Sequence, residues 1–107
     1  MANPTKFTWV VPTTNTDGSA ITAGELTGYD IGVRPASGTA GTYPIMTTVA
    51  DPAATQEPIA SLSAVLAPGD YAAAIRSDAA TNSVWSSEVT FSITAPVPNP
   101  PSAFTVA

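Results

Sequence analysis

The chain has 107 residues, a net charge of −5 and only 10% charged residues, and it contains neither cysteine nor histidine. This length suits one domain, and the lack of cysteine excludes disulfides and thiolate metal sites. Its three basic residues form no patch, so we expect no binding to nucleic acid. No apolar run approaches the roughly 20 residues of a membrane span, so we expect no membrane partner.

Apolar and polar residues alternate with the period of β-strands through the first part of the chain. A strand is predicted over residues 7–11, and Pro12 ends it because proline cannot donate to a strand ladder. Residues 13–27 are rich in turn formers and predict a long connection. The next strand is predicted over residues 28–34.

The middle of the chain is less regular. A strand is predicted over residues 42–49, with Tyr43, Ile45 and Val49 on one face. Residues 51–58 contain two prolines and are predicted to form a loop. The pattern of residues 59–66 fits either a short strand or a single helical turn.

Two further strands are predicted after the Pro68-Gly69 turn. The first spans residues 71–75, and a polar loop over residues 78–83 follows it. The second spans residues 85–94, and its inward side chains are expected to be Val89, Phe91 and Ile93. With no helix of ordinary length, the chain is predicted to be an all-β sandwich of six strands.

The end of the chain differs in composition from the rest. Four prolines within residues 95–101 predict a stiff, extended spacer. The last nine residues, 99–107, have the pattern of a further strand, with Phe104 and Val106 on one face. We therefore divide the chain into a sandwich, residues 1–94, and a spacer with a C-terminal strand, residues 95–107.

Several segments resemble a fibronectin type III domain, particularly its bacterial and phage versions. Residues 7–12 (FTWVVP) are similar to the second strand of that family, and residues 26–31 (LTGYDI) resemble its third. Residues 66–71 (LAPGDY) resemble the tyrosine corner, and residues 84–88 (VWSSE) the start of the last strand. The resemblance implies an immunoglobulin-like antiparallel β-sandwich, with Trp9 and Tyr71 as core anchors.

The chain departs from this family at its beginning, because only six residues precede the predicted strand 7–11. Residues 98–106 (PNPPSAFTV) are similar to the missing first strand, which is thus displaced to the C-terminus. Such a segment can pair with a neighbouring copy, complete its own domain, or remain a loose tail. We favour pairing of this segment with a neighbouring copy. The assembly residues would then be Phe104, Val106, Pro98, Pro100 and Pro101.

Residues that could carry chemistry are few. Without histidine the usual general base is missing, and Lys6 is the only lysine, so we expect neither an enzyme nor a cofactor. Asp17, Glu25 and Asp30 could in principle supply oxygens to calcium, but their spacing favours turns. Trp85 is the candidate contact for a glycan. Its competing interpretation is a half-buried ring at the sheet edge, stacked by Arg34 or Arg76.

The resemblance and composition together predict an accessory virion protein of a tailed bacteriophage. It would decorate or cement a capsid or tail, with other copies of itself and a major capsid or tail protein as partners. Host-surface glycans are an alternative partner. Nothing near Met1 resembles a signal peptide, so synthesis in the host cytoplasm is expected. The alternative is a carbohydrate-binding or spacer module of a secreted bacterial enzyme or adhesin.

Overall fold

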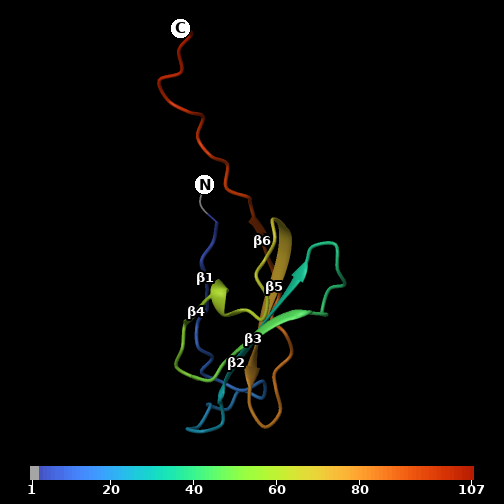
Figure 1. Cartoon of the computed structure of the whole chain (residues 1–107). Helices are drawn as coiled ribbons and strands as arrows, with labels where there is room; N and C mark the ends of the chain where they lie inside the picture. Colours follow the sequence, from blue (N-terminus) through green and yellow to red (C-terminus); the bar gives the residue numbers. More distant parts are fainter. Residues whose placement is uncertain (1–2) are drawn as a thin grey trace.

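The computed structural model describes residues 3–107, which form an all-β structure of two antiparallel sheets (Figure 1). The smaller sheet pairs β1 (Lys6–Thr8) with β4 (Gln56–Pro58). The larger sheet has the order β3-β2-β5-β6. Its strands are β2 (Gly28–Pro35), β3 (Ile45–Val49), β5 (Gly69–Asp78) and β6 (Val89–Ile93). This arrangement confirms the predicted all-β class and is consistent with a sandwich.

The core lies between the two sheets and is anchored on β2. Tyr29, Ile31 and Val33 alternate along that strand and are almost fully buried, as expected for one face of a central strand. Phe7 from β1 packs against both of the clusters that these residues form. Its ring meets that of Phe91 edge to face, with the centroids 6.1 Å apart. The two sheets therefore share one continuous core.

The two expected core anchors are both in contact with this core. Trp9 is half-buried and packs edge to face on Tyr29, with ring centroids 5.3 Å apart. Tyr71 is buried, and its hydroxyl donates to the carbonyl of Ala67, four residues earlier. A tyrosine hydroxyl bonded to the preceding turn in this way is the arrangement that the resemblance implied.

Three of the predicted strands are shorter in the structure, whereas β5 is longer than the predicted strand over residues 71–75. β1 ends at Thr8, so residues 9–11 lie beyond it, although the Trp9 amide still bonds Thr55. β3 starts at Ile45, and Tyr43 lies outside it, over the opposite face of the sheet at Gly32. β6 starts at Val89 rather than residue 85. The residues that were expected to extend these three strands instead contact side chains or other segments of the chain.

The region of residues 51–66 was also predicted incorrectly in part. The predicted loop 51–58 contains the strand β4, which pairs with β1 even though it ends in a proline. Pro58 is tolerated because it stands at the last position of an edge strand. Residues Ile59–Ser61 form a single 3-10 turn, η1, which settles the open choice in favour of the helical turn.

Residues 95–107 continue beyond β6 and lead away from the sandwich as an extended segment (Figure 1). All of them are exposed and none belongs to a strand. The molecule is accordingly elongated, with principal extents of 76, 28 and 21 Å. The possibility that this segment completes its own sandwich is therefore not realised in the isolated chain. Within residues 3–107, no helix has the length and apolar character needed to cross a membrane.

Candidate functional site

The sandwich is closed along one of its long sides. After β4, residues 59–66 cross from the small sheet to the outer edge of β3, and Leu62 is buried in the core on the way. The Ser63 amide donates to the Met46 carbonyl at 3.0 Å, and the Met46 amide donates to the Ser63 hydroxyl at 3.1 Å. This segment covers the edge of β3 and fills the space between the sheets on that side.

The opposite side, between β1 and β6, is open. A cavity of about 100 Å³ lies there between Phe7 of β1, the following Trp9, and Val89 at the start of β6. A second cavity of about 250 Å³ continues from it toward Pro12 and Val84. Both cavities are lined by Trp9, Ile75 and Ser86, so they form one groove. We call this the inter-sheet groove; its walls are residues 7–12 and residues 83–89.

Apolar side chains that face solvent lie at this groove. Val10 is 91% exposed and Val84 is 88% exposed, and both line its wider part. Val89 is 62% exposed and lines the narrower part. Single exposed valines are ordinary on a protein surface, but three along one open groove indicate a surface suited to contact.

The wall formed by residues 83–89 is irregular because serine side chains replace part of a strand ladder. The Ser83 and Ser86 amides donate to the carbonyls of Ser77 and Ile75, at 3.0 and 2.8 Å. In return, the amides of Ser77 and Ile75 donate to the hydroxyls of Ser83 and Ser86 rather than to carbonyls. Local serine bonds of this kind compete with regular secondary structure, which explains why β6 begins only at Val89.

The outer edge of β1 presents unpaired backbone groups to the groove side. Trp9 donates its amide to Thr55, and the Thr5 carbonyl accepts from Ile59, so residues 5 and 9 bond toward β4. Successive residues of a strand direct their backbone groups to opposite sides. The backbone groups of Lys6 and Thr8 therefore point to the open edge, which no other strand of residues 3–107 occupies.

The ends of β1 and β6 fix the direction of the groove. Asn3 and Thr94 share three hydrogen bonds of 2.9–3.0 Å: the Asn3 side-chain oxygen accepts from the amide and the hydroxyl of Thr94, and the Asn3 side-chain nitrogen donates to the Thr94 carbonyl. Phe7 lies beside Phe91, and Trp9 shares the groove with Ser86. The two strands therefore run in opposite directions, and the end of β6 lies beside the start of β1. We refer to the Thr94 end and the Pro12 end of the groove.

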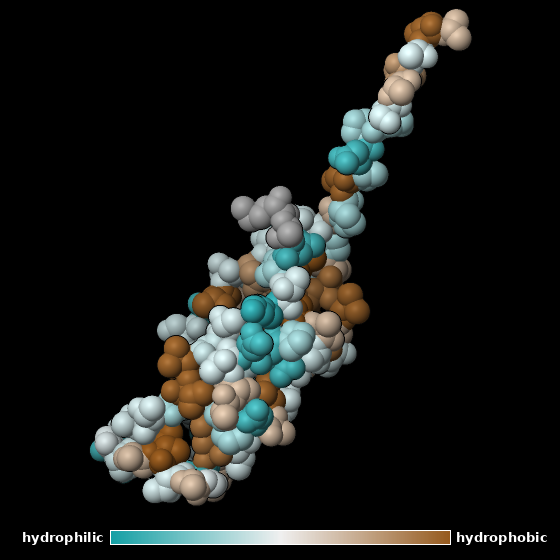
Figure 2. Space-filling view, turned by 90° about the vertical axis from the view of Figure 1, so that its left-hand side faces the viewer, coloured by the Kyte–Doolittle hydropathy of each residue, from teal (hydrophilic) through white to brown (hydrophobic). Residues whose placement is uncertain are grey.

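The predicted assembly residues all lie in the extended C-terminal segment. Phe104 is 86% exposed and Val106 is 93% exposed, and Pro98, Pro100 and Pro101 are exposed as well. Figure 2 shows this segment projecting from the body, with hydrophobic residues at intervals along it. In the isolated chain the structure does not bring these residues to the groove.

Trp85, the candidate glycan contact, is half-buried on the outer face of the larger sheet. The Arg76 guanidinium lies 4.6 Å from the centre of its ring, and the Tyr43 ring lies 4.8 Å away. This matches the interpretation of a ring stacked by Arg76. Arg34 instead belongs to a separate network.

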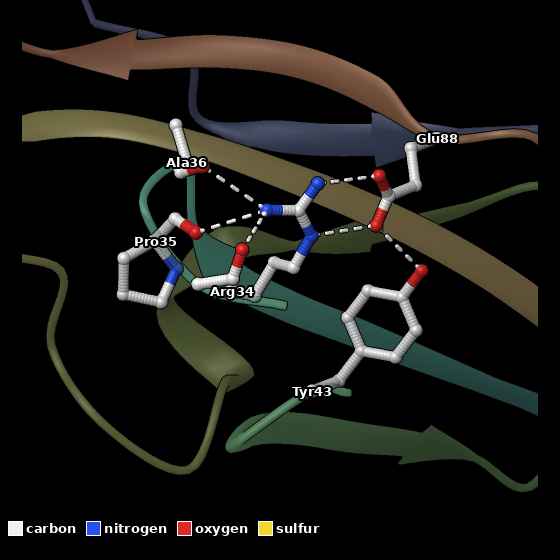
Figure 3. A network of polar contacts seen from close by, with 6 residues as sticks. Arg34, Pro35, Ala36, Tyr43 and Glu88 are labelled. Carbon is white, nitrogen blue, oxygen red and sulfur yellow. Dashed lines mark hydrogen bonds and ion pairs between the residues drawn. The ribbon is translucent and has the colours of Figure 1, made fainter. Parts of the chain in front are cut away.

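That network joins Arg34 to Glu88 and Tyr43 (Figure 3). Two guanidinium nitrogens of Arg34 donate to the two Glu88 oxygens at 2.7 and 2.8 Å, and the Tyr43 hydroxyl donates at 2.8 Å. The remaining Arg34 nitrogen donates to the carbonyls of Pro35, Ala36 and Gly38. Hydrogen bonds from Arg34 and Tyr43 lower the pKa of Glu88 to about 2. The network fixes the loop after β2 and has the character of a structural site.

A second polar cluster lies further along the same face. Arg76 donates to Asp30 at 2.9 Å, and Thr48 donates to the other Asp30 oxygen at 3.0 Å. Burial raises the pKa of Asp30, but hydrogen bonds from Asp78, Arg76 and Thr48 outweigh it, so that pKa lies below its usual value. Burial, together with the neighbouring Asp30 carboxylate, raises the pKa of Asp78 to about 6.

The three carboxylates considered for calcium serve different local structures. Asp17 accepts from the Ser19 amide and hydroxyl, and Glu25 accepts from Asn15, both within the long connection before β2. Asp30 is paired with Arg76. In the described part of the chain, no three acidic side chains lie close enough together to hold a metal ion.

The inter-sheet groove is the part of the site that the sequence did not reveal. The resemblance predicted a displaced first strand at residues 98–106 but not the surface that would receive it. The contribution of residues 83–89 to the second wall depends on the serine bonds to β5. Comparisons with known proteins add no identification: no protein-family model, no curated protein and no solved structure matches this chain.

Proposed function

We propose that this protein is a non-enzymatic structural protein that assembles by donating its C-terminal strand to a neighbouring subunit. The setting we propose is a bacteriophage virion, where it decorates or cements the capsid or tail. The assembly role rests on the presence, in one chain, of two surfaces that lack a partner. One is an open groove beside an unpaired strand edge, and the other is an exposed, apolar-alternating segment.

The sheet order supports the more specific fold that the resemblance implies, a fibronectin type III-like sandwich. In the correspondence that the resemblance implies, β1 and β4 are the second and fifth strands and pair with each other, and the other four strands form the larger sheet. The strand that the resemblance identifies as displaced would lie beside β1. This correspondence, the low surface charge and the resemblance to phage domains favour the virion setting.

Deletion of residues 96–107 tests the assembly role. The full-length protein is expected to show a weight-average molar mass above that of the monomer that rises with concentration. The truncated protein is expected to remain a monomer, because the donated strand is gone. Light scattering coupled to size-exclusion chromatography measures both. Monomers at every concentration, before and after deletion, would refute strand exchange. Detection of the chain at a fixed copy number in purified virions tests the setting.

A carbohydrate-binding or spacer module is the second candidate. The wider part of the groove carries Trp9 and Trp85 beside Ser77 and Ser83, and aromatic rings with nearby hydroxyls suit a sugar. Binding on a glycan array that disappears in Trp85→Ala would favour this function. Arg76→Ala is the companion variant, since it uncovers the Trp85 ring instead of removing it.

A further inference from the structure

We infer that the acceptor of the C-terminal strand is the inter-sheet groove of a second copy, entered from its Pro12 end. The strand then runs antiparallel to β1, and copies join head to tail with a single polarity. This inference rests on the strand exchange proposed above and specifies its binding site, its direction and the resulting assembly.

The groove and the C-terminal segment are complementary in chemistry. The groove offers an apolar interior at Phe7, Trp9 and Val89, and the segment offers Phe104 and Val106 on one face. A strand beside β1 would also bond the outward backbone groups of Lys6 and Thr8. Main-chain bonds at an open edge, combined with alternate side chains in a groove, are a recurrent mode of strand recognition.

The edges of β3, β4 and β5 are poorer acceptors. Ser63 already bonds both backbone groups of Met46 at the edge of β3. The last residue of β4 is a proline, which cannot donate a backbone hydrogen bond to an added strand. β5 extends past the end of β6, and residues 83–86 cover this part of its edge through their bonds to Ser77 and Ile75. Within residues 3–107, β1 and β6 both have an open edge beside the apolar groove, and the resemblance places the displaced strand beside β1.

The chain's own groove is unsuited to its own tail. The tail leaves from Thr94, which Asn3 holds at the end where β1 begins. To run antiparallel to β1, the tail must first reach the Pro12 end, nine residues of extended chain from Asn3, or about 30 Å. The seven-residue spacer spans about 22 Å. Its prolines favour extension over the immediate reversal that a parallel arrangement requires.

A second copy placed beyond the Thr94 end receives the tail without any reversal. The segment already points along the long axis, away from the body (Figures 1 and 2). If the next copy has the same orientation, its Pro12 end faces the arriving strand. Each copy then gives one strand and receives one, which is a heterologous contact that forms an open chain or a ring.

Site-directed disulfide formation between full-length chains tests this site, and the absence of native cysteine makes it clean. If Phe104 and Val106 enter the groove, residues 103 and 105 share the outer face with Thr8. Thr8→Cys protein is mixed with Ala103→Cys or Thr105→Cys protein that has been activated as the thionitrobenzoate disulfide. We expect one of the two tail variants to form a covalent heterodimer, since facing residues of neighbouring strands are within disulfide range.

Two matched controls accompany this experiment. Ala64→Cys places an exposed thiol on the closed side of the sandwich and is expected to cross-link at least tenfold less than Thr8→Cys. Val106→Ser in the tail variant is expected to reduce the Thr8→Cys cross-link at least tenfold. Val65→Ser, which alters an equally exposed valine away from the groove, is expected to leave the yield unchanged.

The outcomes separate this inference from the proposed function. Tail-dependent oligomers in which Thr8→Cys reacts no better than Ala64→Cys would overturn the groove assignment but leave strand exchange intact. A molar mass that stops at twice the monomer would overturn the head-to-tail polarity, because a reciprocal dimer requires the opposite entry. A chain that is monomeric with or without its tail would overturn the proposed function itself.

Discussion

Asp78 and Asp30 are two carboxyl groups that share the outer face of the larger sheet with a single neighbouring cation, Arg76. Asp30 takes the bond from Arg76 and stays ionised, while Asp78 is left beside a negative charge in a partly buried position. When two such groups interact, one pKa falls and the other rises. A protonated Asp78 can donate to Asp30, whereas an ionised Asp78 cannot, and Asp78 Oδ1 has no hydrogen-bond partner within residues 3–107.

This arrangement predicts a pH-dependent stability. The pKa of Asp78 is raised in the folded state from 3.8 to about 6. The free energy of unfolding that protonation of Asp78 contributes is therefore fully present below pH 3.8 and is lost as the pH rises through about 6. Asp78→Asn keeps a donor toward Asp30 without the charge. Urea unfolding should find this variant more stable than the wild type at pH 7.5, by on the order of 1–2 kcal/mol after allowing for solvent screening.

The difference between the two proteins should shrink toward zero at pH 4, where the wild-type Asp78 is protonated. Asp70→Asn is the control, since it removes an exposed acid from the same strand. A stability difference between Asp78→Asn and wild type that is the same at pH 4 and pH 7.5 would contradict the assignment.

At the scale of elements, β2 is covered on both faces, although only one face looks apolar in the sequence. Its outward residues are Asp30, Gly32 and Arg34, and they are covered by polar bonds and by the Tyr43 ring. A Cβ added at Gly32 would lie 2.5 Å from Cγ and 2.6 Å from Cβ of Tyr43. Glycine is therefore required here by the close approach of a side chain from the connection before β3.

Gly32→Ala consequently tests the packing of Tyr43 on β2. The new methyl group displaces the Tyr43 ring from its contacts with Trp85 and Glu88, at a cost of about 1–3 kcal/mol in unfolding free energy. In a Tyr43→Gly background, which also removes the Cβ at residue 43, the clash is absent, and the same substitution should cost only a few tenths of a kcal/mol. Denaturant unfolding of the four proteins of this cycle measures the coupling. Equal costs in both backgrounds would exclude the contact.

At the scale of the whole molecule, the tail dominates the dimensions but not the packing. The radius of gyration is 18.6 Å, whereas a compact chain of this length has about 13 Å. The core clusters consist of residues from 7 to 93, with no contribution from the tail. The sandwich therefore does not depend on the tail for its own stability.

Removal of residues 96–107 should thus change the size and leave the stability unchanged. At concentrations where the protein is monomeric, small-angle scattering should show the radius of gyration falling toward about 13 Å. The melting midpoint should shift by no more than about 1–2 °C, since exposed residues without contacts contribute little. A large drop in the midpoint would mean that the tail packs on its own domain in solution.

The sequence predicted the long central strands well and the short edge strands poorly. β2 and β5 have clear alternation because both lie in the core of the larger sheet. β4 was taken for part of a loop because three residues are too few for a periodic signal, and because its proline argues against a strand. Tyr43 was placed on the wrong face because nothing in its local pattern indicates the space above Gly32.

The sequence by itself determined the all-β class, the anchoring roles of Trp9 and Tyr71, and the apolar alternation at Phe104 and Val106. The all-β class and the alternation depend on local periodicity, and the anchoring roles depend on the resemblance of residues 7–12 and 66–71 to known strands; all of these can be read without knowing any partner. Only the tertiary structure decided which side of the sandwich is open. That depends on contacts between distant segments: Ser63 with Met46 on the closed side, and Asn3 with Thr94 at the end of the open one.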